Sequence, residues 1–179
     1  MSESSMSPQV ASLFKELGIC ESKIAHRRLQ LQPEASKLIE VFEDKRAYKL
    51  SPKAATAWDA MKDAAGETGV SLRLVSAFRS VAYQGELIRR KLSRGEKIDS
   101  ILRVNAAPGY SEHHTGNAID VTVNGCPQLT EEFEQTQAFR WLTNHASCYG
   151  FQLSYPRDNP YGYKYEPWHW CFHPNFSGR

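Results

Sequence analysis

Two short segments of the sequence carry side chains that suit a metal centre. The first reads SEHHTGNAID at residues 111–120, and the second reads EPWHW at residues 166–170. A catalytic zinc site takes three protein ligands, leaves its fourth position to water, and has a separate base that accepts the water's proton. The two segments provide three candidate ligands and one candidate base: His113, Asp120, His169 and Glu166. The sequence therefore predicts one zinc ion and hydrolytic chemistry.

The segments around two of these ligands alternate between apolar and polar positions, as strands do. In residues 117–123 the apolar side chains share one face, and Asp120 lies on the other. In residues 168–172 the aromatic side chains share one face, and His169 lies on the opposite one. We therefore expect two strands that each turn one ligand toward the same cleft.

The remaining two candidates depend on breaks in regular structure. The Gly-Asn pair at 116–117 allows a turn through which His113 and Asp120 converge. Pro167 lacks the donor that a strand ladder needs and tends to begin a strand. Glu166 is therefore expected just outside the final strand, from where its carboxylate can reach the water.

The rest of the chain reads as helices with a few strands. Ser7-Pro8 and Ser51-Pro52 each combine an N-cap with a proline in the first turn, and Gly18 ends the first of these two helices. Further helices are predicted at 81–92, 96–105 and 131–149, and further strands at 70–76 and 151–153. Residues 24–50 mix short apolar alternation with a helix-like stretch at 35–42, and their structure is left unassigned.

Composition narrows the class of protein. The chain has 179 residues, a length that suits a single domain, and its net charge is +2, with no cluster of basic residues of the kind that binds nucleic acid or an anionic membrane. Residues 1–8 have neither the basic nor the apolar stretch of a secretion signal, so we expect a cytoplasmic protein. The four cysteines lack C-x-x-C spacing, which argues against a thiolate zinc site and favours free thiols.

The two segments closely resemble the zinc D-Ala-D-Ala carboxypeptidase family of bacterial cell-wall enzymes, which includes the VanY-type and LdcB-type carboxypeptidases. That family's signature is S-x-H-x-x-G-x-A-x-D followed by E-x-W-H, and every fixed position is present here. The resemblance covers about residues 51–173. It implies a single α+β domain with a small antiparallel sheet flanked by helices, in which 51–179 form the zinc carboxypeptidase core and 1–50 a helical and extended N-terminal extension.

The resemblance also implies roles for further residues. Ser76-Ala77-Phe78-Arg79-Ser80 matches a similar S-x-x-R-S of the family, and Arg79 is expected to stabilise the oxyanion or the substrate's carboxylate. Glu166 is expected to act as general base and then general acid. Ser76, Gln84 and Ser111 are candidates for substrate binding, with Ser111 alternatively orienting His113. His114 is expected to pack or to border the substrate, while the roles of His173 and Cys171 stay open.

The family acts on peptidoglycan stem peptides, and no nucleic acid, membrane or obligate protein partner is expected. A D,D-carboxypeptidase in the cytoplasm would destroy wall precursors, so the expected location favours an L,D-carboxypeptidase that converts tetrapeptide to tripeptide in cell-wall recycling. The alternatives are a D,D-carboxypeptidase acting on pentapeptide, a phage-type endolysin peptidase, and a non-catalytic peptidoglycan-binding module. A candidate base at Glu166 favours an enzyme over the module, because a structural zinc site needs no base.

Overall fold

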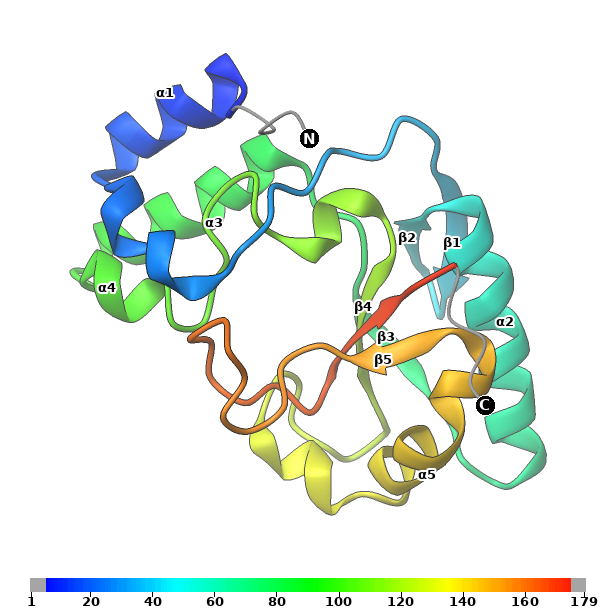
Figure 1. The fold of residues 1–179 in the computed structure, drawn as a ribbon. Coiled ribbons are helices and arrows are strands. Elements are labelled where there is room, and N and C mark those ends of the chain that lie inside the picture. The colour runs from blue at the N-terminus through cyan, green and yellow to red at the C-terminus, as the bar shows by residue number, and fades with distance from the viewer. Residues whose placement is uncertain (1–5, 175–179) are drawn as a thin grey trace.

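The computed structural model describes residues 6–174, with a four-stranded sheet near the centre of the molecule (Figure 1). The strand order is β3-β4-β6-β5, and every neighbouring pair is antiparallel. The strands are β3 (Arg73–Ser76), β4 (Ala118–Thr122), β5 (Phe151–Leu153) and β6 (His169–Phe172). The prediction of an α+β fold with a small antiparallel sheet is confirmed.

Two helices, α2 (Pro52–Glu67) and α5 (Gln137–His145), pack on the sheet through one apolar cluster. Fully buried members of this cluster come from both helices, from β4 and β5, and from the segments before β3 and α5: Trp58, Met61, Leu72, Ile119, Phe133, Leu142 and Phe151. Helix α2 begins as predicted, since the hydroxyl of Ser51 accepts a hydrogen bond from the backbone N–H of Ala54. This cluster holds the sheet that carries Asp120 and His169.

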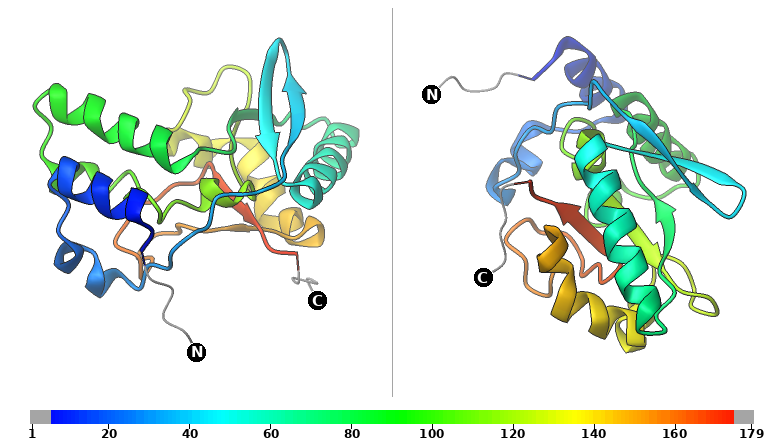
Figure 2. Two further views of the ribbon diagram at one scale, coloured as in Figure 1. Left: turned by 90° about the horizontal axis from the view of Figure 1, so that it is seen from above. Right: turned by 90° about the vertical axis from the view of Figure 1, so that its right-hand side faces the viewer.

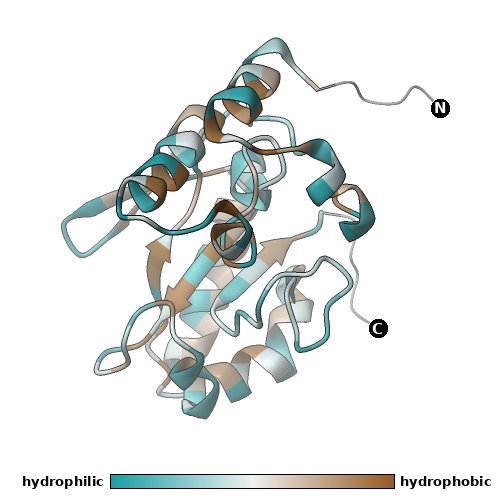
Figure 3. Ribbon diagram, turned by 90° about the vertical axis from the view of Figure 1, so that its left-hand side faces the viewer, coloured by the Kyte–Doolittle hydropathy of each residue, from teal (hydrophilic) through white to brown (hydrophobic). Residues whose placement is uncertain are grey.

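A second apolar cluster joins the helices α1 (Pro8–Leu17), α3 (Val81–Ser93) and α4 (Ile98–Ile101), which lie together away from α2 in Figure 1. Helices α1 and α3 each bury one face and expose the other. Their apolar and polar residues follow one another along the helix, so the hydropathy colour changes from residue to residue in Figure 3. Ser7 caps α1, and Gly18 ends it with φ +66°, both as predicted. The first helix is thus part of the folded body.

The unassigned region contains a two-stranded hairpin of β1 (Ile39–Glu43) and β2 (Arg46–Leu50). It stands out from the rest of the molecule in the left view of Figure 2. The helix-like interpretation of residues 35–42 is wrong, because residues from Ile39 onward form a strand in which Ile39 pairs with Leu50. Asp44, with φ +52°, makes the turn between the two strands. Periodicity over so few residues does not separate helix from strand.

The long helix predicted at 131–149 is also partly wrong. It consists of a 3-10 turn η4 (Glu131–Gln135), helix α5 and a second 3-10 turn η5 (Ala146–Tyr149). Thr136 has extended backbone angles and caps α5 by accepting from the N–H of Phe139, so the helix cannot run through it. The other predicted elements are present: α3 runs one residue past its predicted end, β5 has its predicted bounds, and β3, β4, β6 and α4 (Ile98–Ile101) are shorter than predicted. Three further 3-10 turns are η1 (Glu21–Lys23), η2 (Ala25–Arg27) and η3 (Glu112–Thr115).

Candidate metal centre and active-site cleft

The three predicted ligands meet on one face of the sheet. Asp120 on β4 lies directly opposite His169 on β6, and partners in an antiparallel register point their side chains to the same side. Turn η3 delivers His113, and Gly116 ends that turn with φ +69°, as the predicted turn requires. One ligand atom from each of the three side chains lies within 4.8 Å of the other two. The expected convergence of the two segments is therefore confirmed.

The hydrogen bonds of His113 determine which of its nitrogens faces the other ligands. Its Nδ1 lies 2.6 Å from the backbone carbonyl of Ala77 and donates to it, which leaves Nε2 as an acceptor. Nε2 lies 3.3 Å from Oδ2 of Asp120 and, among the described residues, has no hydrogen-bond partner. A buried lone pair without a donor, facing a carboxylate, fits a metal cation. Burial and then the charge of Arg79 lower the pKa of His113 to about 4, so the ring is neutral at pH 7.

His169 contacts carboxylates on both sides of its ring. Nδ1 lies 3.0 Å from Oδ1 of Asp120, and Nε2 lies 2.9 Å from Oε2 of Glu112. Although burial disfavours the charged ring, the hydrogen bonds to these two carboxylates raise the pKa of His169 to about 10. Burial alone would raise the pKa of Asp120, but the adjacent His113 and His169 hold it well below its usual range. The cluster thus contains an ionised carboxylate ready to bind a cation.

Glu112 is the residue of this centre that sequence analysis missed. Its side chain is largely buried, which by itself would raise its pKa, but the hydrogen bond to His169 and the nearby charges together lower it. A carboxylate that accepts from the far nitrogen of a metal-binding histidine sets the tautomer and orientation of the ring. Glu112 lies between two signature positions, but its partner is 57 residues away, so no spacing rule could indicate the pair.

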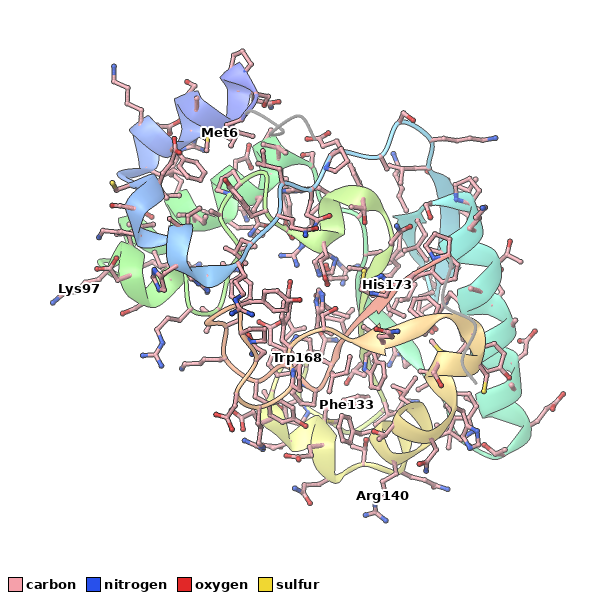
Figure 4. The ribbon with its side chains drawn as sticks, viewed as in Figure 1. Met6, Lys97, Phe133, Arg140, Trp168 and His173 are labelled. Carbon is pink, nitrogen blue, oxygen red and sulfur yellow. The ribbon has the colours of Figure 1, made fainter. Side chains whose placement is uncertain are left out.

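Glu166 precedes β6, as predicted from Pro167. Its carboxylate is mostly buried, with Oε2 3.9 Å from Nδ1 of His169, and it lines the same small cavity as His113. Burial raises the pKa of Glu166 to about 7. In Figure 4 the labels of Trp168 and His173 mark the two ends of β6, the strand that Glu166 precedes. The carboxylate is therefore beside the three predicted ligands and can exchange a proton near neutral pH.

Arg79 also reaches the site. Its Nη2 lies 3.9 Å from Oδ2 of Asp120, and its Nη1 donates to Oε1 of Gln84 over 3.3 Å. Gln84 is buried and also donates to the carbonyl of Ala106 over 2.7 Å. This arrangement makes Gln84 a support for the guanidinium of Arg79.

The two predicted serines occupy different places. Ser111 is buried and lines the small cavity beside His113 and Glu166. Ser76 lies opposite Asp120 across the β3–β4 pair. A larger cavity of about 370 Å³ adjoins the site and shares Arg79, Asp120 and Glu166 with it. Substrate can therefore approach the predicted ligands from this side.

The other three side chains considered in the sequence analysis, those of His114, Cys171 and His173, do not belong to the group of three candidate ligands. His114 is fully buried, accepts from the N–H of Gly109 through Nε2, and contacts the carbonyl of Arg79 through Nδ1, so both of its ring nitrogens bond to the backbone. In the part of the chain that the structure describes, the candidate metal group contains neither Cys171 nor His173. No helix within residues 6–174 is both long and apolar enough to cross a membrane.

Comparison with known proteins places this geometry in a family. The chain is 37% identical over 134 residues to the putative carboxypeptidase YodJ of Bacillus subtilis, covering 72% of this chain and 48% of YodJ. The chain thus spans about half the length of that relative. The structure of the LdcB LD-carboxypeptidase is 33% identical, with a TM-score of 0.63 over 79% of this chain and 65% of LdcB.

A second solved structure is similar in fold. It is a variant of the vancomycin-resistance D,D-pentapeptidase VanY in complex with Zn(II), 23% identical with a TM-score of 0.57, covering 83% of this chain and 80% of that one. The family model described as VanY, D-alanyl-D-alanine carboxypeptidase, matches residues 47–175. Because that match takes in well over half of the sequence and both predicted motifs, the chain belongs to the VanY family of D-alanyl-D-alanine carboxypeptidases.

Proposed function

We propose that this protein is a zinc carboxypeptidase that removes the terminal D-alanine from peptidoglycan stem peptides. The observation that carries the proposal is the cluster of His113, Asp120 and His169 with the carboxylate of Glu166 beside it. Membership of a carboxypeptidase family supports the same reaction class.

Zinc is the proposed metal because the ligand atoms are two imidazole nitrogens and a carboxylate oxygen. The Zn(II) in the related VanY structure supports this choice. His113 would bind through Nε2 and His169 through Nδ1, since their other nitrogens face Ala77 and Glu112. When bound, the ion supplies a Lewis acid that makes water nucleophilic near neutral pH.

The protein's own groups carry the proton transfers in the proposed mechanism. Glu166 takes a proton from the attacking water as the water oxygen bonds to the scissile carbonyl carbon. When the C–N bond breaks, Glu166 returns that proton to the leaving amine of D-alanine, so protons balance over the cycle. Arg79 provides a fixed positive charge for the oxyanion or for the terminal carboxylate of the peptide.

The substrate-binding roles follow from the same arrangement. Ser111 lines the cavity and is proposed to contact the peptide directly. Gln84 is proposed to act by holding Arg79, and Ser76 by its place beside Asp120 on the neighbouring strand. A terminal carboxylate that meets Arg79 would favour a carboxypeptidase over an endopeptidase, whose substrate continues past the cut bond.

Of the two stem-peptide specificities, we favour the L,D reaction, in which a tetrapeptide becomes a tripeptide during wall recycling. The similarity to LdcB at 33% identity supports this choice. The second candidate is D,D cleavage of a pentapeptide, which the VanY family description favours.

The deciding experiment incubates zinc-loaded protein and its Glu166→Ala variant with muramyl tri-, tetra- and pentapeptides and follows released D-alanine by mass spectrometry. Conversion of tetrapeptide to tripeptide by the unaltered protein alone supports the L,D reaction. Pentapeptide trimmed only to tetrapeptide supports the D,D reaction. Release from none of the substrates would overturn the carboxypeptidase proposal.

A further inference from the structure

Arg27 is an arginine of the N-terminal segment that is only 7% exposed, although arginine is among the residues least often buried. It lies in η2, before the residues that the family model matches. Its Nε donates to the carbonyl of Tyr161 over 2.7 Å, and its Nη1 donates to the carbonyl of Leu102 over 2.8 Å. The guanidinium also lies over the ring of Tyr163, 4.4 Å from the centroid.

Two of these contacts hold residues 154–168, the loop between β5 and β6. This loop has no helix or strand, so its shape depends on isolated contacts. Gly162 has φ +66°, and a Cβ placed there would lie 3.0 Å from Nε of Arg27. The backbone N–H of Lys164 donates to the carbonyl of Arg103 over 2.9 Å. Arg27 is therefore packed directly against the loop backbone.

The same loop forms one wall of the active-site cavity. The ring of Tyr155 lies 4.7 Å from that of His169 and 4.8 Å from that of Tyr163, measured between centroids. Tyr163 and Glu166 both line the small cavity beside Arg79. Within residues 6–174, the hydroxyl of Tyr163 is buried without a hydrogen-bond partner. A buried polar group left unpaired is costly, and a substrate group would satisfy it.

We propose that Arg27 is a positioning residue that holds this loop so that the hydroxyl of Tyr163 donates a hydrogen bond to the bound peptide. The inference rests on the proposed carboxypeptidase function. Arginine suits the task because its planar fork reaches two carbonyls at once and stacks on a ring, whereas the single ammonium of lysine cannot reproduce that geometry. The N-terminal segment thereby contributes to substrate recognition.

The test compares Arg27→Lys, Tyr163→Phe and the double variant in the release of D-alanine from the muropeptide that the unaltered protein cleaves. Arg27→Lys should lower kcat/KM about ten- to a hundredfold, the cost of a displaced substrate contact, with unchanged zinc affinity. Arg27→Lys should have a much smaller effect when Phe replaces Tyr163, because residues that act through one contact are not additive. Equal effects of Arg27→Lys in both backgrounds would overturn the proposal.

Arg89→Ala is the matched control. Arg89 also joins the N-terminal segment to the core, through an ion pair with Glu16, but both side chains are about half exposed and belong to helices α1 and α3. This variant should leave kcat/KM unchanged. A loss equal to that of Arg27→Lys would show a general effect of loosening the segment and would contradict a specific role for Arg27.

Hydrogen–deuterium exchange gives a readout that does not need activity. Arg27→Lys should speed exchange in residues 155–166, including the bonded amides of Lys164 and Glu166, and leave β4 and β6 protected. If the unaltered protein releases no D-alanine, the proposed function fails, and this measurement still decides whether Arg27 holds the loop. If Arg27→Lys does not fold, Arg27→Gln takes its place. Unchanged exchange in the loop would overturn the positioning role.

Discussion

The ring of His169 joins two carboxylates, with Nε2 2.9 Å from Glu112 and Nδ1 3.0 Å from Asp120. Asp120 and Glu112 come from one signature segment, yet they lie on opposite edges of this ring. When the ring is neutral, a proton held on Nε2 by Glu112 leaves a lone pair on Nδ1 that faces the candidate metal centre. The interaction with Glu112 thus determines which nitrogen of His169 is available as a ligand.

Replacing Glu112 by alanine should weaken zinc binding about 10- to 100-fold, because His169 would lose the acceptor that orients it. Glu112→Gln should weaken binding less, since its amide oxygen still accepts from Nε2. Competition with a chromophoric chelator measures the affinity. Glu86→Ala, at an exposed glutamate paired with Arg90, is the control. Equal zinc affinity in Glu112→Ala and the unaltered protein would contradict the role assigned to Glu112.

Zinc binding should release about one proton per ion at pH 7.5. In the metal-free protein the pKa of His169 is raised to about 10, so the ring is protonated and must lose its Nδ1 proton to bind. His113 contributes none, because its pKa is lowered to about 4. Zinc affinity should accordingly rise as pH increases from 6 toward 9. Calorimetry in buffers of different ionisation enthalpy counts the protons, and a count of zero would contradict the protonated state of His169.

Replacing Glu166 by glutamine should lower kcat about 10²- to 10⁴-fold, because the amide cannot accept a proton from water. Zinc affinity should be retained, since Glu166 is outside the ligand cluster. Glu131→Gln is the matched control, because Glu131 lines the larger cavity and pairs with Arg157 at an exposed position. Peptide release and bound zinc are measured on the same samples. Full activity in Glu166→Gln would exclude this residue as the base.

Replacing Gly116 by alanine should destabilise the protein more than replacing Gly125. Both glycines have positive φ, +69° and +82°, so both variants pay for an unfavourable backbone conformation. Only at Gly116 would the new Cβ crowd other atoms, lying 2.9 Å from the backbone N of Ser51. The added crowding should cost about 1–3 kcal/mol in the free energy of unfolding measured with urea. Equal losses in the two variants would show that the region around Gly116 relaxes freely.

Much of the local structure was predictable because its causes lie within a few residues. Ser7 and Ser51 cap helices through amides three residues away, and the alternation around Asp120 indicated which side of the strand carries the carboxylate. Thr136 shows where this approach fails. The apolar spacing on both sides of it is helical, but a cap formed by its own hydroxyl divides the predicted helix.

The sequence by itself determined which side chains are candidate ligands, which carboxylate is the candidate base, and the turn that Gly116 permits, because each follows from residue type and short-range spacing. Only the tertiary structure decided that Glu112 accepts from His169, that Gln84 supports Arg79, and that Arg27 reaches the loop before β6. These pairs depend on how strands and loops distant in the chain are brought together. A periodic pattern reports which face a side chain occupies, but packing of the whole chain decides what that face meets.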